Sequence, residues 1–231
     1  MIRSRSQERV LIVAAHPDDE LLGAGGTAAR HAEDGASVQC VIVAEGATSR
    51  GKSEGNVVAE LREHAAQASA AIGLPPPVML GLPDNRLDGL DLLDVVQPLE
   101  RLFKELRPTT IYTHHMGDLN IDHQVVCRAV MTACRPMPDH ETTKIFTFET
   151  VSSTEWMAPN PGHMFQPRLF VDITRTISAK LAALKVYTTE MREFPHARSL
   201  EAVDALSRWR GASIGVAHAE AFDIMRIVER D

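Results

Sequence analysis

The chain has 231 residues, of which 44% are hydrophobic and 24% charged, the proportions of an ordinary globular protein that can bury a core. Its formal net charge of −7 argues against a nucleic-acid partner, because a phosphate backbone is normally bound by a basic surface. No apolar run approaches the ~20 residues of a membrane span, and the first residues lack an apolar signal segment, so we expect a cytoplasmic protein without a membrane partner.

Apolar runs and longer amphipathic patterns alternate along the chain. A short run rich in β-branched residues predicts a strand, and apolar residues at every third or fourth position predict a helix. In chain order these patterns predict strands over 9–14, 37–44, 78–80, 109–113, 144–149 and 169–171, and helices over 21–34, 57–72, 90–106, 122–134, 177–188 and 200–210. Pro98 falls inside the third helix, which it would kink or divide, and the segment 220–228 fits either a helix or an edge strand.

The alternation of strands and helices over the first ~135 residues predicts βαβ units. We therefore expect an α/β fold of the Rossmann-like three-layer α/β/α type, with a mostly parallel sheet. No linker or repeat interrupts the pattern, so we expect a single domain over 1–231. Parallel sheets place their sites at the carboxyl ends of strands. Four polar segments fall there, over 16–20, 45–50, 81–86 and 114–123.

The first of these segments is the most informative. Residues 14–20 are Ala-Ala-His-Pro-Asp-Asp-Glu, directly after an apolar strand. Unpaired charge beside a core costs free energy, and a bound cation would offset that cost. His16 and Asp19 are three residues apart, so one helical turn would place them on the same side. Asp18 would then point elsewhere, where its carboxylate is free to act on a water molecule.

The second dense polar segment follows the strand over 109–113 and leads into a helix. It ends in the pair Asp122-His123, and we expect Asp122 to cap the helix and His123 to lie in its first turn. A catalytic zinc site commonly takes three ligands from His and Asp or Glu and keeps a position open for water. His16, Asp19 and His123 fit that pattern. The alternative is a solvated loop with one capping aspartate.

The pairing of an early His-Pro-Asp-Asp-Glu with a later Asp-His, each after a strand, resembles the PIG-L/LmbE family of metal-dependent N-deacetylases. The likeness continues in the helix over 60–73, in Gly-Leu-Pro-Asp-Asn over 81–85 and in Ala-Glu-Ala-Phe over 219–222. The resemblance implies an LmbE-like fold and a hydrolase acting on a linear amide bond. Its substrate would be a small-molecule N-acetylated amino sugar or sugar conjugate.

The resemblance also implies the roles of individual residues. His16, Asp19 and His123 would ligate the metal, usually Zn²⁺, although Fe²⁺ also suits such a donor set. The metal would polarise the acyl carbonyl and acidify its water, and Asp18 would take the water proton as the general base.

Two further residues match positions that hold sugar hydroxyls or phosphate in the family, namely Arg50 and Asp84. Without the family, Arg50 is equally well a solvated surface charge, and Asp84 equally well bonds the backbone of its own turn. The sequence leaves open whether identical chains assemble into an oligomer.

The chain departs from the family pattern at one position. Many members have His-Pro-Asp-His where this chain has Asn-Ile-Asp-His over 120–123. Asn120 donates a hydrogen bond but cannot transfer a proton, so our hypothesis is that Asp18 returns its proton to the leaving amine. The alternative acids are His114, His115 and His218. The residues expected to support the metal ligands are His114, His115, Asp118, Asn120 and Asp122.

Two other interpretations compete with a deacetylase. Residues 23–28 satisfy the dinucleotide pattern G-x-G-x-x-A. However, the first glycine should follow the strand directly, and here three carboxylates occupy that turn and would repel a pyrophosphate. The other is a non-catalytic metal-binding or sugar-binding module, against which Asp18 argues, because a pure binding site has no use for a spare carboxylate.

Overall fold

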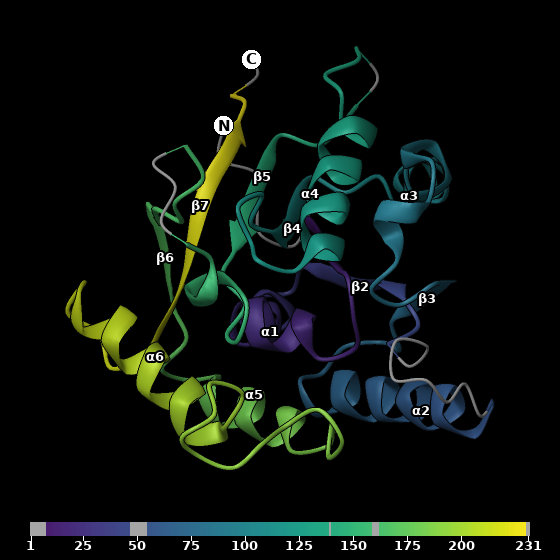
Figure 1. The fold of residues 1–231 in the computed structure, drawn as a ribbon. Coiled ribbons are helices and arrows are strands. Elements are labelled where there is room, and N and C mark those ends of the chain that lie inside the picture. Colours follow the sequence, from purple (N-terminus) through teal and green to yellow (C-terminus); the bar gives the residue numbers. More distant parts are fainter. Residues whose placement is uncertain (1–7, 47–54, 139, 159–161, 230–231) are drawn as a thin grey trace.

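The computed structural model describes residues 8–46, 55–138, 140–158 and 162–229. In these residues seven strands form one sheet in the order β3-β2-β1-β4-β5-β7-β6 (Figure 1). The strands are β1 (Arg9–Ala14), β2 (Ser37–Ala44), β3 (Val78–Leu82), β4 (Thr110–His114), β5 (Lys144–Phe148), β6 (Leu169–Asp172) and β7 (Ala219–Ile227). Strands β1 to β5 pair in parallel, and β7 is antiparallel to both of its neighbours. The predicted Rossmann-like, mostly parallel sheet is confirmed.

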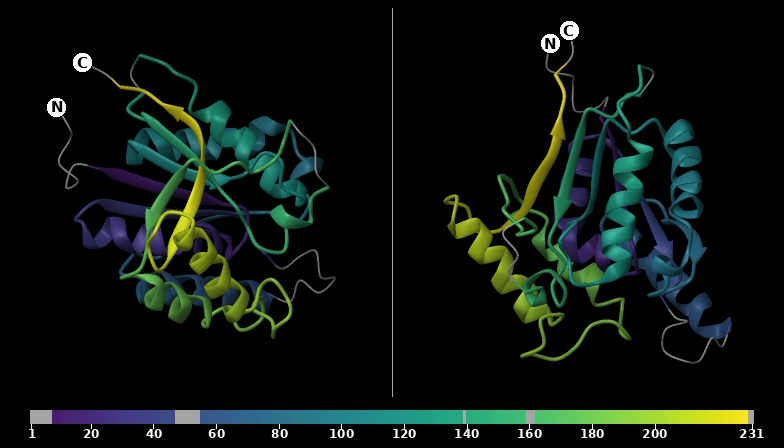
Figure 2. Two further views of the ribbon diagram at one scale, coloured as in Figure 1. Left: turned by 90° about the vertical axis from the view of Figure 1, so that its left-hand side faces the viewer. Right: turned by 45° about the horizontal axis from the view of Figure 1, so that its top comes forward.

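Helices cover both faces of the sheet (Figure 2). They are α1 (Asp19–Glu33), α2 (Gly55–Ala71), α3 (Leu92–Leu106), α4 (Ile121–Ala133), α5 (Ile177–Leu184) and α6 (Leu200–Ala212), with the 3-10 helices η3 (Leu87–Gly89) and η4 (Thr154–Trp156). Helices α1, α2 and α5 share one core with Ile12 of β1, whereas α3 and α4 share the other with Leu11 and Val13. Successive side chains of a strand point to opposite faces, so the continuous apolar run of β1 supplies both cores.

Some predicted boundaries move for physical reasons. The helix predicted over 21–34 begins at Asp19, because the Asp18 carbonyl accepts the amides of Leu21 and Leu22 and carboxylates are stabilised in a first helical turn. The helix predicted over 177–188 ends at Leu184, after which the backbone continues in tighter turns. Helix α3 runs through Pro98 undivided, with the proline partly exposed, where water can bond the carbonyl that it leaves unpaired.

The segment predicted over 220–228 as a helix or an edge strand is β7, and it lies inside the sheet. It pairs with β5 on one side and β6 on the other. Only its first four residues are buried, and the rest are partly or fully exposed. The segment therefore lacks the regular alternation that would have marked it as a strand.

Two buried side chains complete the hydrogen bonding of α1. In a regular helix the Gly26 amide would bond the Leu22 carbonyl. Here Glu220 of β7 accepts the Gly26 amide at 2.9 Å, and Lys180 of α5 donates to the Leu22 carbonyl at 2.8 Å. Lys180 and Glu220 are 2.6 Å apart and both are buried. Helix α1 is thereby fixed to α5 and β7 close to its first turn.

The glycines of this stretch serve close packing. A Cβ added at Gly23 would lie 2.1 Å from the Phe148 ring of β5, and one at Gly26 would lie 2.8 Å from Ile173. The helix therefore sits against the sheet with no room for a phosphate between them, and the dinucleotide interpretation has no support.

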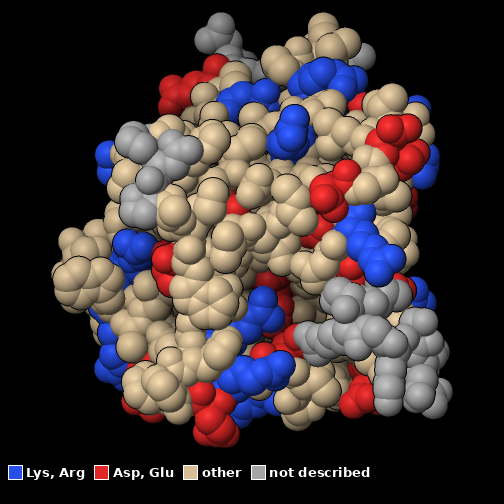
Figure 3. Space-filling view, in the orientation of Figure 1, with Lys and Arg blue, Asp and Glu red and all other residues tan. Residues whose placement is uncertain are grey.

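The described surface is mixed in charge. On the face seen in Figure 3, acidic and basic side chains are interspersed, with no continuous basic stripe. None of the helices in the described ranges has the length and apolarity needed to cross a bilayer.

Candidate metal centre and active site

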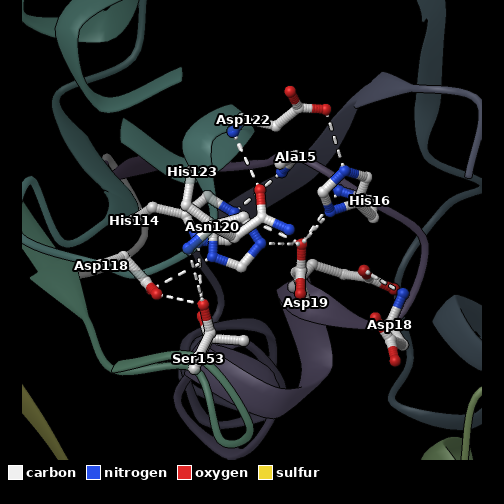
Figure 4. A network of polar contacts seen from close by, with 12 residues as sticks. Ala15, His16, Asp18, Asp19, His114, Asp118, Asn120, Asp122, His123 and Ser153 are labelled. Carbon is white, nitrogen blue, oxygen red and sulfur yellow. Dashed lines mark hydrogen bonds and ion pairs between the residues drawn. The ribbon is translucent and has the colours of Figure 1, made fainter. Parts of the chain in front are cut away.

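The end of β1 and the start of α1 carry the first polar segment. The chain turns sharply there, and the His16 amide donates to Asp19 Oδ2 at 3.0 Å. Asp18 has a φ of 103°, a value that residues other than glycine rarely adopt. The turn places His16 and Asp19 side by side, as their spacing predicted, while Asp18 points away from them (Figure 4).

The second polar segment brings His123, in the first turn of α4, to the same place. Asp19 Oδ2 lies 3.1 Å from His16 Nδ1 and 3.1 Å from His123 Nε2. The three side chains are buried and point toward one another (Figure 4). Strands β1 and β4 are neighbours at the point where the strand order reverses, which is where parallel sheets bind ligands.

The donor atoms of this cluster fit a divalent cation. Asp19 Oδ1 and His123 Nε2 are buried and have no hydrogen-bond partner among the described residues. A buried polar atom without a partner costs free energy, which coordination would recover. Two imidazoles and one carboxylate are a common donor set of catalytic zinc sites, and three protein ligands leave one position for water or substrate.

A carboxylate orients His123 from outside the cluster. His123 Nδ1 lies 3.1 Å from Asp118 Oδ2. Asp118 is in turn held by the hydroxyls of Ser153 and Thr154, on the segment that follows β5. With Nδ1–H directed at Asp118, the lone pair of Nε2 faces Asp19, which is the tautomer that a metal ligand requires.

Asp122 orients His16 in the same way. His16 Nε2 lies 3.1 Å from Asp122 Oδ2, and this carboxylate also accepts the amides of Asn85 at 2.7 Å and Leu87 at 3.0 Å. The prediction that Asp122 caps α4 is therefore wrong. Asn120 is the cap, and its side-chain oxygen accepts the Asp122 amide at 2.8 Å. The freed Asp122 carboxylate ties the turn after β3 to His16.

Burial and hydrogen bonding shift the pKa values of His16 and Asp19 in opposite directions. Burial disfavours the charged ring of His16, but hydrogen bonds to Asp122 and Asp19 outweigh it and raise the pKa of His16 to about 10. Burial also disfavours the charged form of Asp19, yet His123 and His16 hold the pKa of Asp19 well below its ordinary value. A cation bound to His16 must displace a ring proton, so its affinity increases as the pH rises toward that pKa.

Asp18 lies beside the cluster, fully buried, with its two oxygens in different surroundings. Oδ2 accepts a hydrogen bond from Arg198 Nη1 at 2.9 Å, while Oδ1 has no partner in the part of the chain that the structure describes. Burial raises the pKa of Asp18 well above its ordinary value, and the guanidinium of Arg198 opposes that shift without cancelling it.

A small cavity of about 90 Å³ reaches the cluster at His16. Its lining residues are His16, Pro17, Gly46, Leu61, Asp84, Asn85, Asn120, Glu190 and Arg198. Asp84 Oδ1 lies 3.3 Å from His16 Nε2, whereas Arg50 falls outside the described residues. A larger cavity of about 550 Å³, lined by Phe103 and Arg107 among others, lies near the amino ends of β4 and β5, and none of the candidate site residues lines it.

Comparison with known proteins assigns the chain to a family. A sequence profile described as PIG-L, GlcNAc-PI de-N-acetylase, matches residues 11–134, which include both polar segments. The chain belongs to the PIG-L family. Its homologues are named deacetylases, which are hydrolases of amide C–N bonds.

Two curated relatives and one solved structure show how far the likeness extends. The Escherichia coli K12 protein "Uncharacterized deacetylase YaiS" is 30% identical over 79% of this chain and 91% of its own length. The Bacillus cereus "Probable N-acetyl-alpha-D-glucosaminyl L-malate deacetylase 2" is 27% identical over 88% of this chain and 94% of its own length. The conserved protein TT1542 of Thermus thermophilus is 26% identical, has a TM-score of 0.77, and matches 97% of this chain and 98% of that one.

The three histidines considered as acids in this PIG-L protein differ in their surroundings. His114 is fully buried, its ring stacks on His123 with centroids 3.8 Å apart, and its Nε2 accepts the Ala15 amide at 2.8 Å. Burial, reinforced by the neighbouring His123, lowers the pKa of His114 well below its ordinary value. This ring is therefore neutral and supports the cluster by packing.

His115 and His218 make their contacts away from the metal cluster. His115 Nε2 lies 2.9 Å from the His163 carbonyl oxygen, and His218 Nδ1 lies 2.8 Å from the Ser207 hydroxyl of α6. Neither ring contacts the three candidate ligands within the described ranges. Asn120, in contrast, lies in the cavity wall and donates from Nδ2 to Asn85 Oδ1 at 3.0 Å.

The residues that sequence reasoning missed come from segments without a motif. Arg198 and Glu190 lie in the irregular stretch between α5 and α6, and Ser153 lies just before η4. No spacing within these stretches relates them to residues 16–20. The packing of α5 against α1 and α2 brings this part of the chain beside α1.

Proposed function

We propose that this PIG-L protein is a metal-dependent N-deacetylase that hydrolyses the acetamido group of an amino sugar or sugar conjugate. The observation that supports this most directly is the convergence of His16, Asp19 and His123 beside Asp18. Asp19 Oδ1, His123 Nε2 and Asp18 Oδ1 are buried there without a hydrogen-bond partner among the described residues. A purely metal-binding or sugar-binding module would gain nothing from that second carboxylate, whose burial costs free energy.

The cation we propose for the site is Zn²⁺, with Fe²⁺ as the alternative. A divalent cation held by two imidazoles and a carboxylate supplies Lewis acidity, which polarises an acyl carbonyl and makes a water molecule more acidic. Both metals accept this donor set, so metal analysis of the purified protein distinguishes them.

Asp18 carries the proton in this mechanism. Its Oδ1 takes a proton from the attacking water, whose oxygen bonds to the acyl carbon. The same carboxyl group then gives the proton to the sugar nitrogen as the C–N bond breaks, so that acetate and a free amine leave. Asn120 donates hydrogen bonds from the cavity wall but has no proton to transfer. We therefore assign both proton transfers to Asp18.

The substrate class we propose is an N-acetylglucosamine residue linked to another group. The family description refers to GlcNAc-PI, and the Bacillus cereus relative is named for N-acetylglucosaminyl malate. Asp84 lies in the cavity wall, where its carboxylate can accept a hydrogen bond from a sugar hydroxyl. Arg50 stays a predicted contact to a hydroxyl or a phosphate.

The test is acetate release across a panel of N-acetylglucosamine derivatives by protein loaded with Zn²⁺ or Fe²⁺. We expect acetate and free amine in equal amounts from at least one glycoside, and a rate lower by about 100-fold or more from the D18N variant. Stoichiometric metal and sugar binding without turnover of any panel member would contradict the proposal and favour the binding module.

A further inference from the structure

Asp18 occupies a costly arrangement. Its carboxyl group has no exposed surface, and its backbone φ of 103° is strained for a residue with a Cβ. Such strain persists only where the surroundings impose it. The contacts of Asp18 therefore identify which neighbours hold it in place.

Arg198 provides the side-chain contact to the Asp18 carboxylate. Nη1 donates to Asp18 Oδ2 at 2.9 Å, and Nε donates to the Ser152 hydroxyl at 2.7 Å. Glu190 Oε2 lies 3.9 Å from the same Nη1. The guanidinium is planar, so fixing Nε on one side and Nη1 on the other fixes its orientation. Arg198 also lines the cavity that opens onto His16 and Asn120.

The two oxygens of Asp18 are therefore not equivalent. Arg198 engages Oδ2, and Oδ1 has no partner among the described residues although it is buried. We propose that Arg198 is a positioning residue for the deacetylation, and that it holds Oδ2 so that Oδ1 is the oxygen that receives the water proton. This inference rests on the proposed function, and it assigns to Arg198 an action through Asp18 and no contact with the substrate.

An ion pair that aims a carboxylate has a kinetic signature. Without Arg198 the Asp18 carboxylate can turn about its Cβ–Cγ bond, and a misdirected base slows the chemical step without weakening substrate binding. For R198M we expect kcat to fall about 100-fold while KM stays within about threefold of the wild-type value. R198K keeps the positive charge but loses the planar guanidinium that donates to Asp18 and Ser152 at once. Its kcat should therefore lie between those of R198M and the wild type.

Chemical rescue separates positioning from a folding role. In R198A, added methylguanidinium can occupy the space of the missing side chain, and we expect it to raise kcat about tenfold. It should leave wild-type kcat unchanged. R208M is the matched control, because Arg208 forms an exposed ion pair with Asp204 on α6, and its kcat should stay within about twofold.

A second measurement does not depend on turnover. In urea unfolding of zinc-loaded protein, R198M should raise the unfolding equilibrium constant at least about tenfold, because it leaves a buried carboxylate without its cation. In the D18N background the same change should raise it less than about threefold. If no panel substrate releases acetate, the proposed function fails. The double-mutant cycle of R198M and D18N in urea unfolding still tests the coupling between Asp18 and Arg198.

Three results would overturn the inference. One is a raised KM with unchanged kcat in R198M, which would make Arg198 a substrate-binding residue. Another is a loss of kcat that neither R198K nor methylguanidinium restores in part. The third is that R198M changes the unfolding equilibrium constant by the same factor in the wild-type protein and in the D18N variant.

Discussion

The two histidines of the candidate metal site present different ring nitrogens to Asp19, Nδ1 in His16 and Nε2 in His123. The difference follows from where each orienting carboxylate lies. Asp122 takes Nε2 of His16, and Asp118 takes Nδ1 of His123. Each ring is thereby held in one orientation, so the ligand set is organised before a cation arrives.

Removing one orienting carboxylate should weaken metal binding without abolishing it. In D118N the His123 ring loses its charged acceptor, and we expect the Kd for Zn²⁺ to rise about 10–100-fold. A competition titration against a chelating dye measures it. D94N, which changes an exposed carboxylate in the first turn of α3, serves as the control. An unchanged Kd in D118N would show that His123 needs no such support.

The proposed base and a proposed ligand should separate metal binding from turnover. D18N should keep its metal, because Asp18 is not among the ligands, and lose about 10²–10⁴-fold in kcat. H123A should lose most of its bound metal as well as its activity. Metal analysis after desalting, followed by acetate release, distinguishes the two. Near-normal turnover by D18N would refute the mechanism.

How far the site could be predicted depended on where its residues lie in the chain. His16, Asp18, Asp19 and His123 stand in two short segments directly after predicted strands, so strand order alone brings them together. Arg198 has no such marker, because its position depends on the path of the chain after α5. The prediction of Asp122 as the cap of α4 was wrong because Asn and Asp are equally favoured at that position. The sequence does not show that the Asp122 carboxylate is used by His16 instead.

At the scale of elements, α1 depends on side chains from distant parts of the chain. In K180M the Leu22 carbonyl loses its donor, and the buried Glu220 loses its cation. We expect the free energy of unfolding to fall by about 3 kcal/mol, as when one partner of a buried pair is removed. Urea denaturation measures it, with K185M on the exposed side of the same segment as the control. A loss below about 0.5 kcal/mol would show that the pair contributes little.

The strands and helices themselves were predictable where their patterns were long. The apolar run of β1 and the amphipathic helices are confirmed, because burial on one or two faces fixes their periodicity. The sequence did not predict where α1 begins or α5 ends, or that residues 219–227 form a strand, because these features depend on hydrogen bonds to other elements. The second half of β7 is partly or fully exposed, so its residues do not alternate between apolar and polar as in a half-buried strand.

At the scale of the whole molecule, stability should depend on pH through the amino ends of the central strands, at the opposite end of the sheet from the site. Glu8 bonds the Thr110 hydroxyl at 2.8 Å and lies 3.4 Å from His31 and 3.3 Å from Lys144. The hydrogen bond to His31 is the main reason that the pKa of Glu8 falls from 4.5 to about 2.

A carboxylate with a lowered folded-state pKa stabilises the protein above its unfolded-state pKa, and that stabilisation disappears as the pH falls through the folded value. E8Q should therefore reduce the free energy of unfolding by about 1 kcal/mol at pH 7, and the difference should vanish between pH 4.5 and about 2. Urea unfolding at several pH values measures both. A difference that persists at pH 2 would contradict the assignment.

We propose that the whole chain unfolds as one domain, because both cores share the same sheet. The family profile ends at residue 134, yet α1 is completed by Lys180 and Glu220. A fragment ending at residue 134 should therefore show no cooperative thermal transition by circular dichroism, whereas the full chain should show one. A sharp transition in the fragment would contradict this.

The same dependence sets an order of events while the chain is being made. The turn that carries Asp19 emerges from the ribosome early, but the side chain that accepts the Gly26 amide belongs to the last strand. Until β7 has left the exit tunnel, α1 lacks its hydrogen bond to Glu220, and we expect the N-terminal half of the chain to be incompletely packed. A chaperone that binds nascent chains would therefore have the interval between the synthesis of α1 and that of β7 in which to act on this protein.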